Sequence, residues 1–194
     1  MEQLLEWDKA FFLYLNGHHT AWLDPVMMLF SHRLVWGPLY LTLLALIIKR
    51  HGRESWIPVV GIVVTILLAD QVCSGLLKPI VARLRPSHEP SLDGLVHIVN
   101  GYRGGQYGFA SSHAANTFGL AMFFILQYRQ VWKWIWVLLP WAAVVSYTRI
   151  YLGVHYPGDV IAGALIGILA AYAGRWTCRG ILKALHGRRP TPAA

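Results

Sequence analysis

Three short clusters of cationic, hydroxyl and imidazole side chains interrupt a largely apolar sequence. They read Lys78-x6-Arg85-Pro86, Ala110-Ser111-Ser112-His113 and Thr148-Arg149-x5-His155-x3-Asp159. Arginine matches phosphate oxygens two at a time, and lysine adds a compact point charge. Ser111 and Ser112 precede an apolar run that predicts a helix, and their hydroxyls and backbone amides can face an anion over its positive end. The clusters therefore predict a site for a phosphate group.

Two histidines in these clusters have the setting that chemistry on a phosphate requires. His155 lies four residues before Asp159, close enough for the carboxylate to hold one ring nitrogen and leave the other free. Pro157 suits the first turn of a helix and places Asp159 in that turn. With His113 at the same site, the two imidazoles predict one nucleophile and one proton donor.

The composition indicates that membrane helices position these clusters. Of the 194 residues, 56% are hydrophobic and 13% are charged, against about 25% charged in a typical soluble domain. This excludes a soluble globular domain, a disordered chain and a coiled coil. We predict an all-α integral membrane bundle of about five transmembrane helices, with spans at about 25–48, 56–77, 113–129, 132–151 and 158–177.

The N-terminal segment 1–16 predicts a helix of another kind. Its apolar residues repeat at helical spacing and its charged residues lie elsewhere on the wheel, which is typical of a helix in the membrane interface. Its acidic start is unlike a cleaved signal peptide. We expect a single domain over 1–194: this interfacial helix, a transmembrane bundle over 25–177 with a catalytic loop at 78–112, and a basic cytoplasmic tail over 178–194.

Lysine and arginine are distributed unevenly between the two sides of this bundle. Ten of the 17 lie in the 49–55 and 129–133 connections and in the tail after residue 174, which the positive-inside rule places in the cytoplasm. The 78–112 loop and the 150–157 connection then face outward, so all three clusters meet at one membrane face. We expect a multi-pass protein of a bacterial-type cytoplasmic (inner) membrane, with its active site facing the periplasm or outside.

Together these residues resemble the three-part signature of the type-2 phosphatidic acid phosphatases, the superfamily that includes the vanadium haloperoxidases. The resemblance covers 78–159 in motifs and nearly the whole chain in helix layout. It implies a helical membrane enzyme, a phosphoric or diphosphoric ester hydrolase that removes phosphate from a lipid without a metal or a cofactor.

Carried over position by position, the resemblance implies a role for each residue. His155 would attack phosphorus to give a phosphohistidine that water then hydrolyses. Asp159 would orient His155, and His113 would protonate the leaving lipid oxygen. The residues expected to contact the phosphate are Lys78, Arg85, Ser111, Ser112 and Arg149.

The middle cluster departs from the family's usual Pro-Ser-Gly-His. Ser112 stands where a glycine lets the backbone approach the phosphate closely, and Thr148 stands where serine is common. These departures concern the shape of the anion site and therefore the substrate preference, since every expected catalytic side chain is present.

The leading hypothesis is a membrane lipid phosphatase, with undecaprenyl diphosphate as the leading substrate by family resemblance alone. Phosphatidylglycerophosphate, phosphatidic acid and a lipid A phosphate are alternative substrates, and phosphoryl transfer to another lipid is the alternative reaction. A different class is a non-enzymatic protein that binds or carries an anionic lipid. No set of His, Cys and Glu has zinc spacing and no Walker-type loop occurs, so no metal is expected. The basic residues form no nucleic-acid stripe, membrane lipids are the expected partners, and the oligomeric state stays open.

Three further features have interpretations that do not involve substrate. Arg83 is explained by a cation at a helix end whose side chain reaches the membrane interface. Asp70, Ser74 and Lys78 are successive i,i+4 neighbours, so Asp70 either steers Lys78 through Ser74 or pairs with another helix. Gly163-x3-Gly167 predicts close helix packing.

Overall fold

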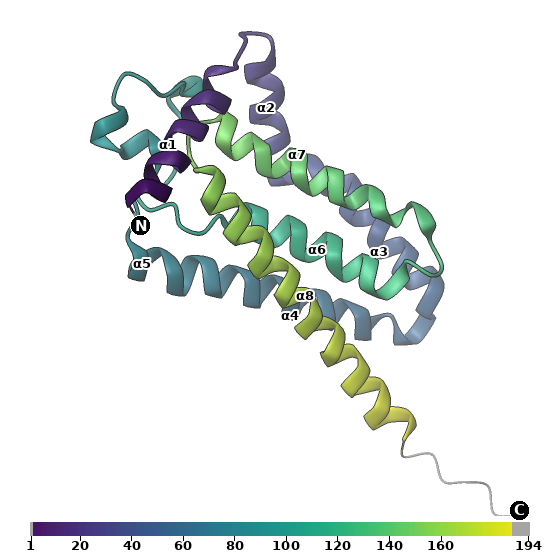
Figure 1. The fold of residues 1–194 in the computed structure, drawn as a ribbon. Coiled ribbons are helices and arrows are strands. Elements are labelled where there is room, and N and C mark those ends of the chain that lie inside the picture. The colour runs from purple at the N-terminus through teal and green to yellow at the C-terminus, as the bar shows by residue number, and fades with distance from the viewer. Residues whose placement is uncertain (1, 188–194) are drawn as a thin grey trace, which may run out of the picture.

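Residues 2–187 are described by the computed structural model, and within that range the chain forms helices and loops with no β-strand (Figure 1). The α-helices are α1 (Glu2–Gly17), α2 (Leu23–Ser31), α3 (Gly37–His51), α4 (Trp56–Asp70), α5 (Lys78–Val81), α6 (Ser112–Tyr128), α7 (Leu138–Tyr151) and α8 (Pro157–His186). A π-helical segment, η3 (Gln71–Leu77), joins α4 to α5 without a break. Arg188 and Arg189 of the predicted basic tail lie outside the described residues.

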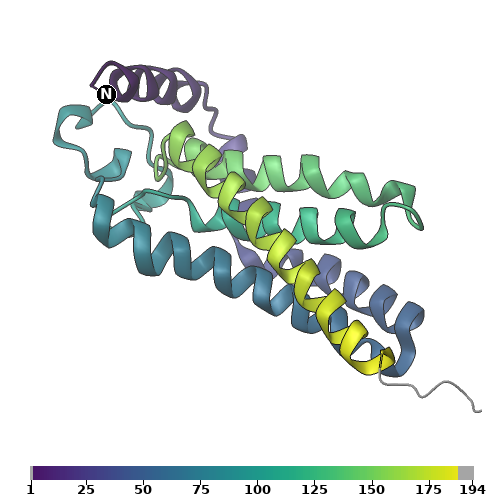
Figure 2. The same ribbon diagram turned by 60° about the horizontal axis from the view of Figure 1, so that its bottom comes forward.

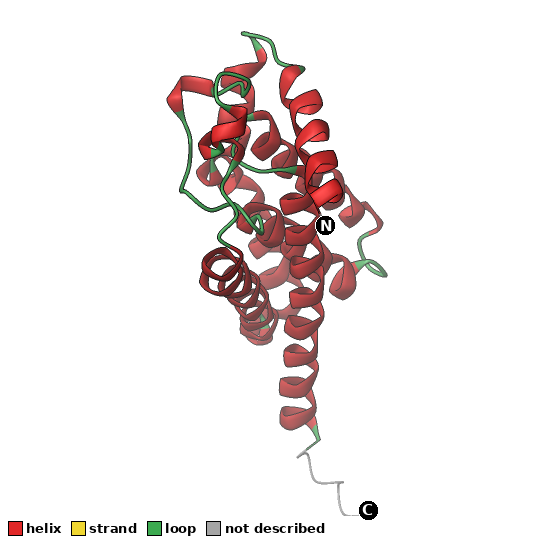
Figure 3. Ribbon diagram, turned by 60° about the vertical axis from the view of Figure 1, so that its left-hand side comes forward, coloured by secondary structure: helices red, strands yellow, loops and turns green. Residues whose placement is uncertain are grey.

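The longer apolar helices lie along one another and form the bundle (Figures 1 and 2). They are α3, α4 with its continuation through η3 and α5, α6, α7 and α8. Helix α8 packs on α4 and α6, and α6 also packs on α7. The long connection between α5 and α6 lies at the end of the bundle away from the C-terminus (Figure 3). The all-α bundle predicted from the sequence is confirmed.

Small residues on α8 let it approach α6 closely. A Cβ atom added to Gly163 would collide with the carbonyl oxygen of Ser111, and one added to Gly167 would collide with that of Ala115. Both glycines are buried. The close packing predicted for this motif is therefore confirmed, and it ties the start of α6 to the first turns of α8.

The predicted spans differ from the observed helices at their ends. Among residues 2–187, two segments are long and apolar enough to cross a membrane as single helices, Trp56–Val81 and Pro157–His186. The first predicted span, 25–48, is wrong as one helix, because Leu23–Ser31 and Arg33–Glu54 meet at an angle of 71° and pass the same test only as a pair. The break lies at His32, whose backbone is extended.

Two more helix boundaries differ from the predicted ones for local reasons. The predicted 132–151 span begins as a 3-10 turn, η7 (Lys133–Val137), before α7 proper starts at Leu138. The last predicted span, 158–177, continues to His186, so the first part of the predicted tail is helical. No proline or positive-φ glycine interrupts α8 over 178–186, and its lysine and arginine side chains suit the C-terminal end of a helix.

Helix α1 lies across the end of the bundle that carries the long connection (Figure 2). One face of α1 leaves large apolar side chains exposed: Leu4, Trp7, Phe11 and Tyr14. The other face is docked. The buried Phe12 ring lies 5.4 Å from the Tyr156 ring, and the side-chain amide of Asn16 donates to the carbonyl oxygen of Tyr151 at 2.8 Å. This two-sidedness suits the predicted interfacial helix.

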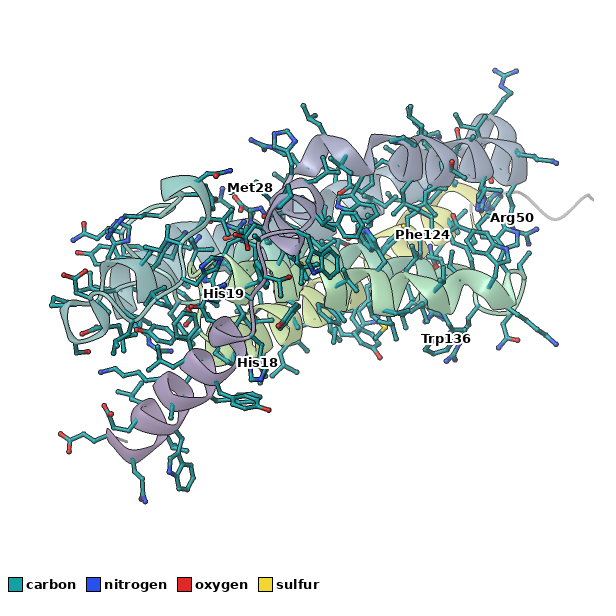
Figure 4. All side chains as sticks on the ribbon, turned by 90° about the horizontal axis from the view of Figure 1, so that it is seen from above. His18, His19, Met28, Arg50, Phe124 and Trp136 are labelled. Carbon is teal, nitrogen blue, oxygen red and sulfur yellow. The ribbon has the colours of Figure 1, made fainter. Side chains whose placement is uncertain are left out.

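The basic connections and the three clusters lie at opposite ends of the bundle. Figure 4 places Arg50, at the end of α3, and Trp136, in η7, at the end opposite His18 and His19, which follow α1. The separation that the sequence predicted between the lysine-rich and arginine-rich connections and the phosphate clusters is therefore present in the fold.

Candidate active site

The three clusters meet where the long connection, α6, α7 and α8 come together. Lys78 begins α5, Arg85 lies in the loop after it, His113 is in the first turn of α6, and Arg149 is in the last turn of α7. His155 lies in the short α7–α8 connection. The positive charges of Arg85, Arg149 and Lys78 all act on His155, so segments far apart in the sequence form one site.

His155 and Asp159 form a buried pair. The ring nitrogen Nδ1 of His155 lies 3.3 Å from Oδ2 of Asp159, and the two residues are 1% and 0% exposed. The same oxygen accepts the backbone N–H of Tyr156 at 3.0 Å, which caps the start of α8. An ionised carboxylate only accepts hydrogen bonds, so Nδ1 carries the proton and Nε2 is the atom available to a substrate.

Burial and three nearby cations keep the His155 imidazole neutral. Burial, followed by the charges of Arg85, Arg149 and Lys78, holds its pKa well below the ordinary histidine value. A neutral imidazole has a free lone pair, which a nucleophile requires. The arrangement is therefore suited to attack by Nε2.

Arg85 is fixed by the backbone of the long connection. Its Nε donates to the carbonyl oxygen of Tyr107 at 3.1 Å, and Gly104 and Gly108 leave room for its side chain, since a Cβ atom on either would lie within 3.3 Å of it. Burial and the neighbouring charge of Arg149 lower the pKa of the Arg85 guanidinium. Two guanidinium groups held close together need an anion between or beside them.

Arg149 is almost fully buried and is held from two sides. Its Nη2 donates to the Tyr102 hydroxyl at 2.9 Å, and its Nη1 donates to the hydroxyl of Ser31 in α2. Its Nε is buried without a hydrogen-bond partner among the described residues. No sequence pattern points to Tyr102 or Ser31, because both belong to segments that meet Arg149 only in the fold.

Lys78 contacts Ser112 through a small hydroxyl network. Its Nζ donates to Ser112 Oγ at 2.9 Å and to Ser74 Oγ at 3.3 Å, and the two hydroxyls are 2.7 Å apart. Ser74 also donates to Asp70 Oδ1 at 3.3 Å. Of the two interpretations of Asp70, steering of Lys78 through Ser74 is the one that the geometry supports. The Ser112 hydroxyl, expected to bind phosphate directly, is instead engaged with Lys78 and Ser74.

Ser111 caps α6 and links it to α8. Its hydroxyl accepts the N–H of Ala114 at 3.5 Å, and its own N–H donates to the carbonyl oxygen of Asp159 at 2.9 Å. The expectation that this N–H faces an anion is therefore wrong, because α8 already takes it. The hydroxyl hydrogen of Ser111 remains as its donor toward a phosphate.

A cavity of about 1100 Å³ opens beside this site and runs into the bundle. His113, Tyr102 and Arg149 line its polar end, and Phe124 in α6 and Ile47 in α3 line its apolar part. His113 and Phe124 are 11 residues apart in one helix, or about 16 Å. The cavity therefore joins Arg149 and His113 to a long apolar chamber.

Arg83 and Asp8 are polar residues of this region whose role the sequence did not predict. Arg83 Nη1 lies 3.1 Å from Asp159 Oδ1 and 2.8 Å from Asp8 Oδ2. The interpretation of Arg83 as a side chain reaching the membrane interface is wrong, because two carboxylates bind it. The one sequence feature that indicates a role for Arg83 at the site is its position two residues before Arg85, inside the first cluster. No sequence feature indicates such a role for Asp8.

Known proteins resemble this chain in sequence and in structure. The family model of the PAP2 superfamily matches residues 58–180. A lipid A 4'-phosphatase of Bacteroides thetaiotaomicron is 42% identical over 194 residues, which are 99% of this chain and 86% of that protein. An undecaprenyl-diphosphatase of Sulfolobus acidocaldarius is 32% identical over 170 residues, 86% of this chain and 76% of that one. The crystal structure of Aquifex aeolicus LpxE superimposes with a TM-score of 0.68 and 25% identity, covering 86% of this chain and 93% of the other.

Proposed function

The chain belongs to the PAP2 superfamily and is a membrane lipid phosphatase, and from this membership we propose that it removes the 4'-phosphate of lipid A. The choice of substrate is supported by the 42% identity to a lipid A 4'-phosphatase along 99% of this chain. A lipid A phosphate is one of the alternative substrates in the sequence analysis. Undecaprenyl diphosphate, the leading substrate of the sequence analysis, is supported by a relative of lower identity, 32%.

The observation that carries a lipid substrate is that Arg149 and His113 of the site line the same cavity as many apolar side chains. Arg149 and His113 stand at one end of a chamber of about 1100 Å³ whose remaining walls are mostly apolar. A ligand with a phosphate at one end and hydrocarbon at the other matches both parts at once. A small water-soluble phosphate would leave the apolar part unfilled.

In the proposed reaction, His155 Nε2 attacks phosphorus in line with the bond to the lipid oxygen. The N–P bond forms as the P–O bond breaks, and His113 delivers its proton to the leaving oxygen. Asp159 holds Nδ1–H at 3.3 Å and stabilises the positive charge that the ring gains. Lys78, Arg85 and Arg149 neutralise the phosphate oxygens, with the Ser111 hydroxyl as a further donor.

The second half of the reaction returns the enzyme to its starting state. Water attacks the phosphohistidine, His113 takes the water proton, and inorganic phosphate leaves as the N–P bond breaks. Hydrolysis is preferred to transfer in this proposal, and product analysis separates the two, since transfer would place labelled phosphate on a second lipid.

We further propose that the site faces the outside of a bacterial cytoplasmic membrane. Arg50 lies at the end of the bundle opposite His18 and His19 (Figure 4), and the basic 129–133 connection follows the end of α6 opposite His113. The positive-inside rule places such connections in the cytoplasm. Helix α1, with exposed Trp7 and Phe11, would then lie at the membrane–water interface on the outer face of the cytoplasmic membrane.

Phosphate release from defined lipids by the purified protein tests the proposal. Lipid A, undecaprenyl diphosphate, phosphatidylglycerophosphate and phosphatidic acid are compared in the same detergent, and mass spectrometry identifies which phosphate lipid A loses. We expect the highest kcat/KM for the 4'-phosphate and none for the His155→Ala variant. A higher kcat/KM for undecaprenyl diphosphate would replace the substrate and keep the enzyme class.

The covalent step has its own test. Brief reaction with ³²P-labelled lipid A, followed by rapid quenching, should leave an acid-labile, base-stable label on the wild-type chain and none on His155→Ala. Activity is also expected to persist in excess chelator and to fall with vanadate. Loss of activity on chelation would contradict the metal-independent mechanism.

A further inference from the structure

We propose that Arg83 and Asp8 are positioning residues for the His155–Asp159 pair, so that helix α1 completes the catalytic end of the bundle. The inference rests on the proposed role of His155. It concerns residues that no phosphate needs to touch, and it begins from the way that the two carboxylate oxygens of Asp159 are used.

The two oxygens of Asp159 have separate partners. Oδ2 faces Nδ1 of His155 at 3.3 Å and the N–H of Tyr156 at 3.0 Å. Oδ1 faces Nη1 of Arg83 at 3.1 Å. Partners on both oxygens fix the plane of the carboxylate, and that plane sets the direction of the His155 ring. Arg83 therefore influences the direction in which Nε2 of His155 points without contacting that atom.

A buried carboxylate also needs a counter-charge. Asp159 is 0% exposed, and an uncompensated charge at such a position is costly. Arg83 is the cation in direct contact with it. This leaves Lys78, Arg85 and Arg149 available to the phosphate. The division separates the cation that serves the catalytic pair from those that serve the substrate.

Arg83 is itself held in place by α1. Asp8 Oδ2 lies 2.8 Å from Nη1 of Arg83, and their side chains are 15% and 16% exposed. The Arg83 guanidinium carbon lies 3.8 Å from the centre of the Tyr156 ring, a cation–π contact. Phe12, one helical turn after Asp8, packs against the same ring in a T-shaped arrangement, with an angle of 68° between the two ring planes. The guanidinium is therefore confined by an ion pair and an aromatic ring.

Asp8 also binds the start of α8 directly. Its Oδ1 accepts the backbone N–H of Gly158 at 2.8 Å, so one carboxylate joins Arg83 and the N-terminus of the helix that carries Asp159. A Cβ atom at position 158 would lie 2.8 Å from Asp8 Oδ2, which explains why a glycine is needed there. Asp8 thus fixes the distance between α1 and the catalytic connection.

The variants Arg83→Gln, Arg83→Lys and Asp8→Asn test this role, with Glu6→Gln as the matched control. Glu6 is an acid on the same helix, and within residues 2–187 its one ion-pair partner is Lys9. We expect kcat to fall about 100-fold for Arg83→Gln and about tenfold for Asp8→Asn, with KM changed less than about threefold. Arg83→Lys should recover part of kcat, and Glu6→Gln should match the wild type.

The double variant and an NMR measurement separate positioning from a general loss of structure. The Asp8→Asn variant keeps an oxygen that can accept the Gly158 N–H and removes the charge that faces Arg83. Asp8→Asn combined with Arg83→Gln should therefore lose no more kcat than Arg83→Gln alone. In ¹⁵N-histidine spectra of the substrate-free protein, His155 should carry its proton on Nδ1 in the wild type and lose that preference in Arg83→Gln. The spectrum needs no substrate, so it reports on this inference even if lipid A is not the substrate.

Three outcomes would overturn the inference. An unchanged kcat and an unchanged His155 tautomer in Arg83→Gln would leave Arg83 without a positioning role. A raised KM with kcat intact would make Arg83 a substrate ligand. Additive losses in the double variant would show that the charge of Asp8 acts on a group other than Arg83. Failure of the wild type to release phosphate from lipid A contradicts the proposed function instead.

Discussion

The ammonium group of Lys78 lies 2.9 Å from the hydroxyl oxygen of Ser112. This contact joins the first and second clusters, and it uses the serine that stands where the family usually has glycine. The Ser74 hydroxyl, at 2.7 Å from that of Ser112, completes the seat of the lysine. Position 112 therefore supplies a side-chain ligand for a cation of the phosphate site.

Replacing Ser112 by alanine should lower kcat/KM about tenfold, mainly through KM. A hydrogen bond to a charged group contributes about 1.5 kcal/mol, which corresponds to about a tenfold change. Ser112→Gly should show the same loss if the hydroxyl is what matters. Steady-state kinetics on lipid A measure both, with Ser91→Ala in the exposed loop as control. Equal kcat/KM for Ser112→Gly and the wild type would contradict the role of the hydroxyl.

The low pKa of His155 predicts how stability depends on pH. Burial and then the charges of Arg85, Arg149 and Lys78 keep the folded pKa well below 6.5. The unfolded chain takes up this proton near pH 6.5 and the folded chain does not, so acid favours unfolding by about 1.4 kcal/mol at pH 5.5. Lowering the pH from 7.5 to 5.5 should therefore reduce the free energy of unfolding less in His155→Gln than in the wild type, as thermal unfolding at each pH would measure. Equal reductions in the two proteins would show that a group other than His155 takes up the proton.

Filling the cavity should affect lipid substrates selectively. Leu120 lines the chamber between the polar end and Phe124, and a tryptophan there would occupy space needed by hydrocarbon. We expect Leu120→Trp to raise KM for lipid A at least about tenfold and to leave hydrolysis of a short, water-soluble phosphate ester unchanged. Leu165→Trp, on the exposed face of α8 at 57% exposure, is the matched control. Equal effects on both esters would show that the tail does not use this chamber.

Two glycines of α8 should respond in opposite ways to alanine. At Gly167 the new Cβ would collide with the Ala115 carbonyl, and at Gly180 it would meet nothing within 4 Å. Gly167→Ala should lower the free energy of unfolding by about 1–3 kcal/mol, whereas Gly180→Ala should raise it by up to about 1 kcal/mol. Thermal unfolding in detergent measures both. A stabilised Gly167→Ala variant would mean that α6 and α8 are less tightly packed than described.

The sequence by itself determined the helical membrane bundle, the family and the end of the bundle where the chemistry lies. Apolar runs predict membrane helices because charge is costly in hydrocarbon. The motif spacings predict the site because each cluster lies within one or two turns of a helix end, where local geometry is set by the cluster's own residues. His155 and Asp159 are only four residues apart, so their spacing alone predicts the pair that the structure shows.

The tertiary structure decided what pairs with what across long stretches of chain. Arg83 meets Asp8 and Asp159, Arg149 meets Tyr102 and Ser31, and no local pattern announces any of these contacts. A cation at a helix end has the same sequence pattern whether its side chain reaches the membrane interface or binds a carboxylate from another helix. The apolar chamber is also invisible in the sequence, since its walls come from separate helices, and cavities depend on how far packed helices stand apart.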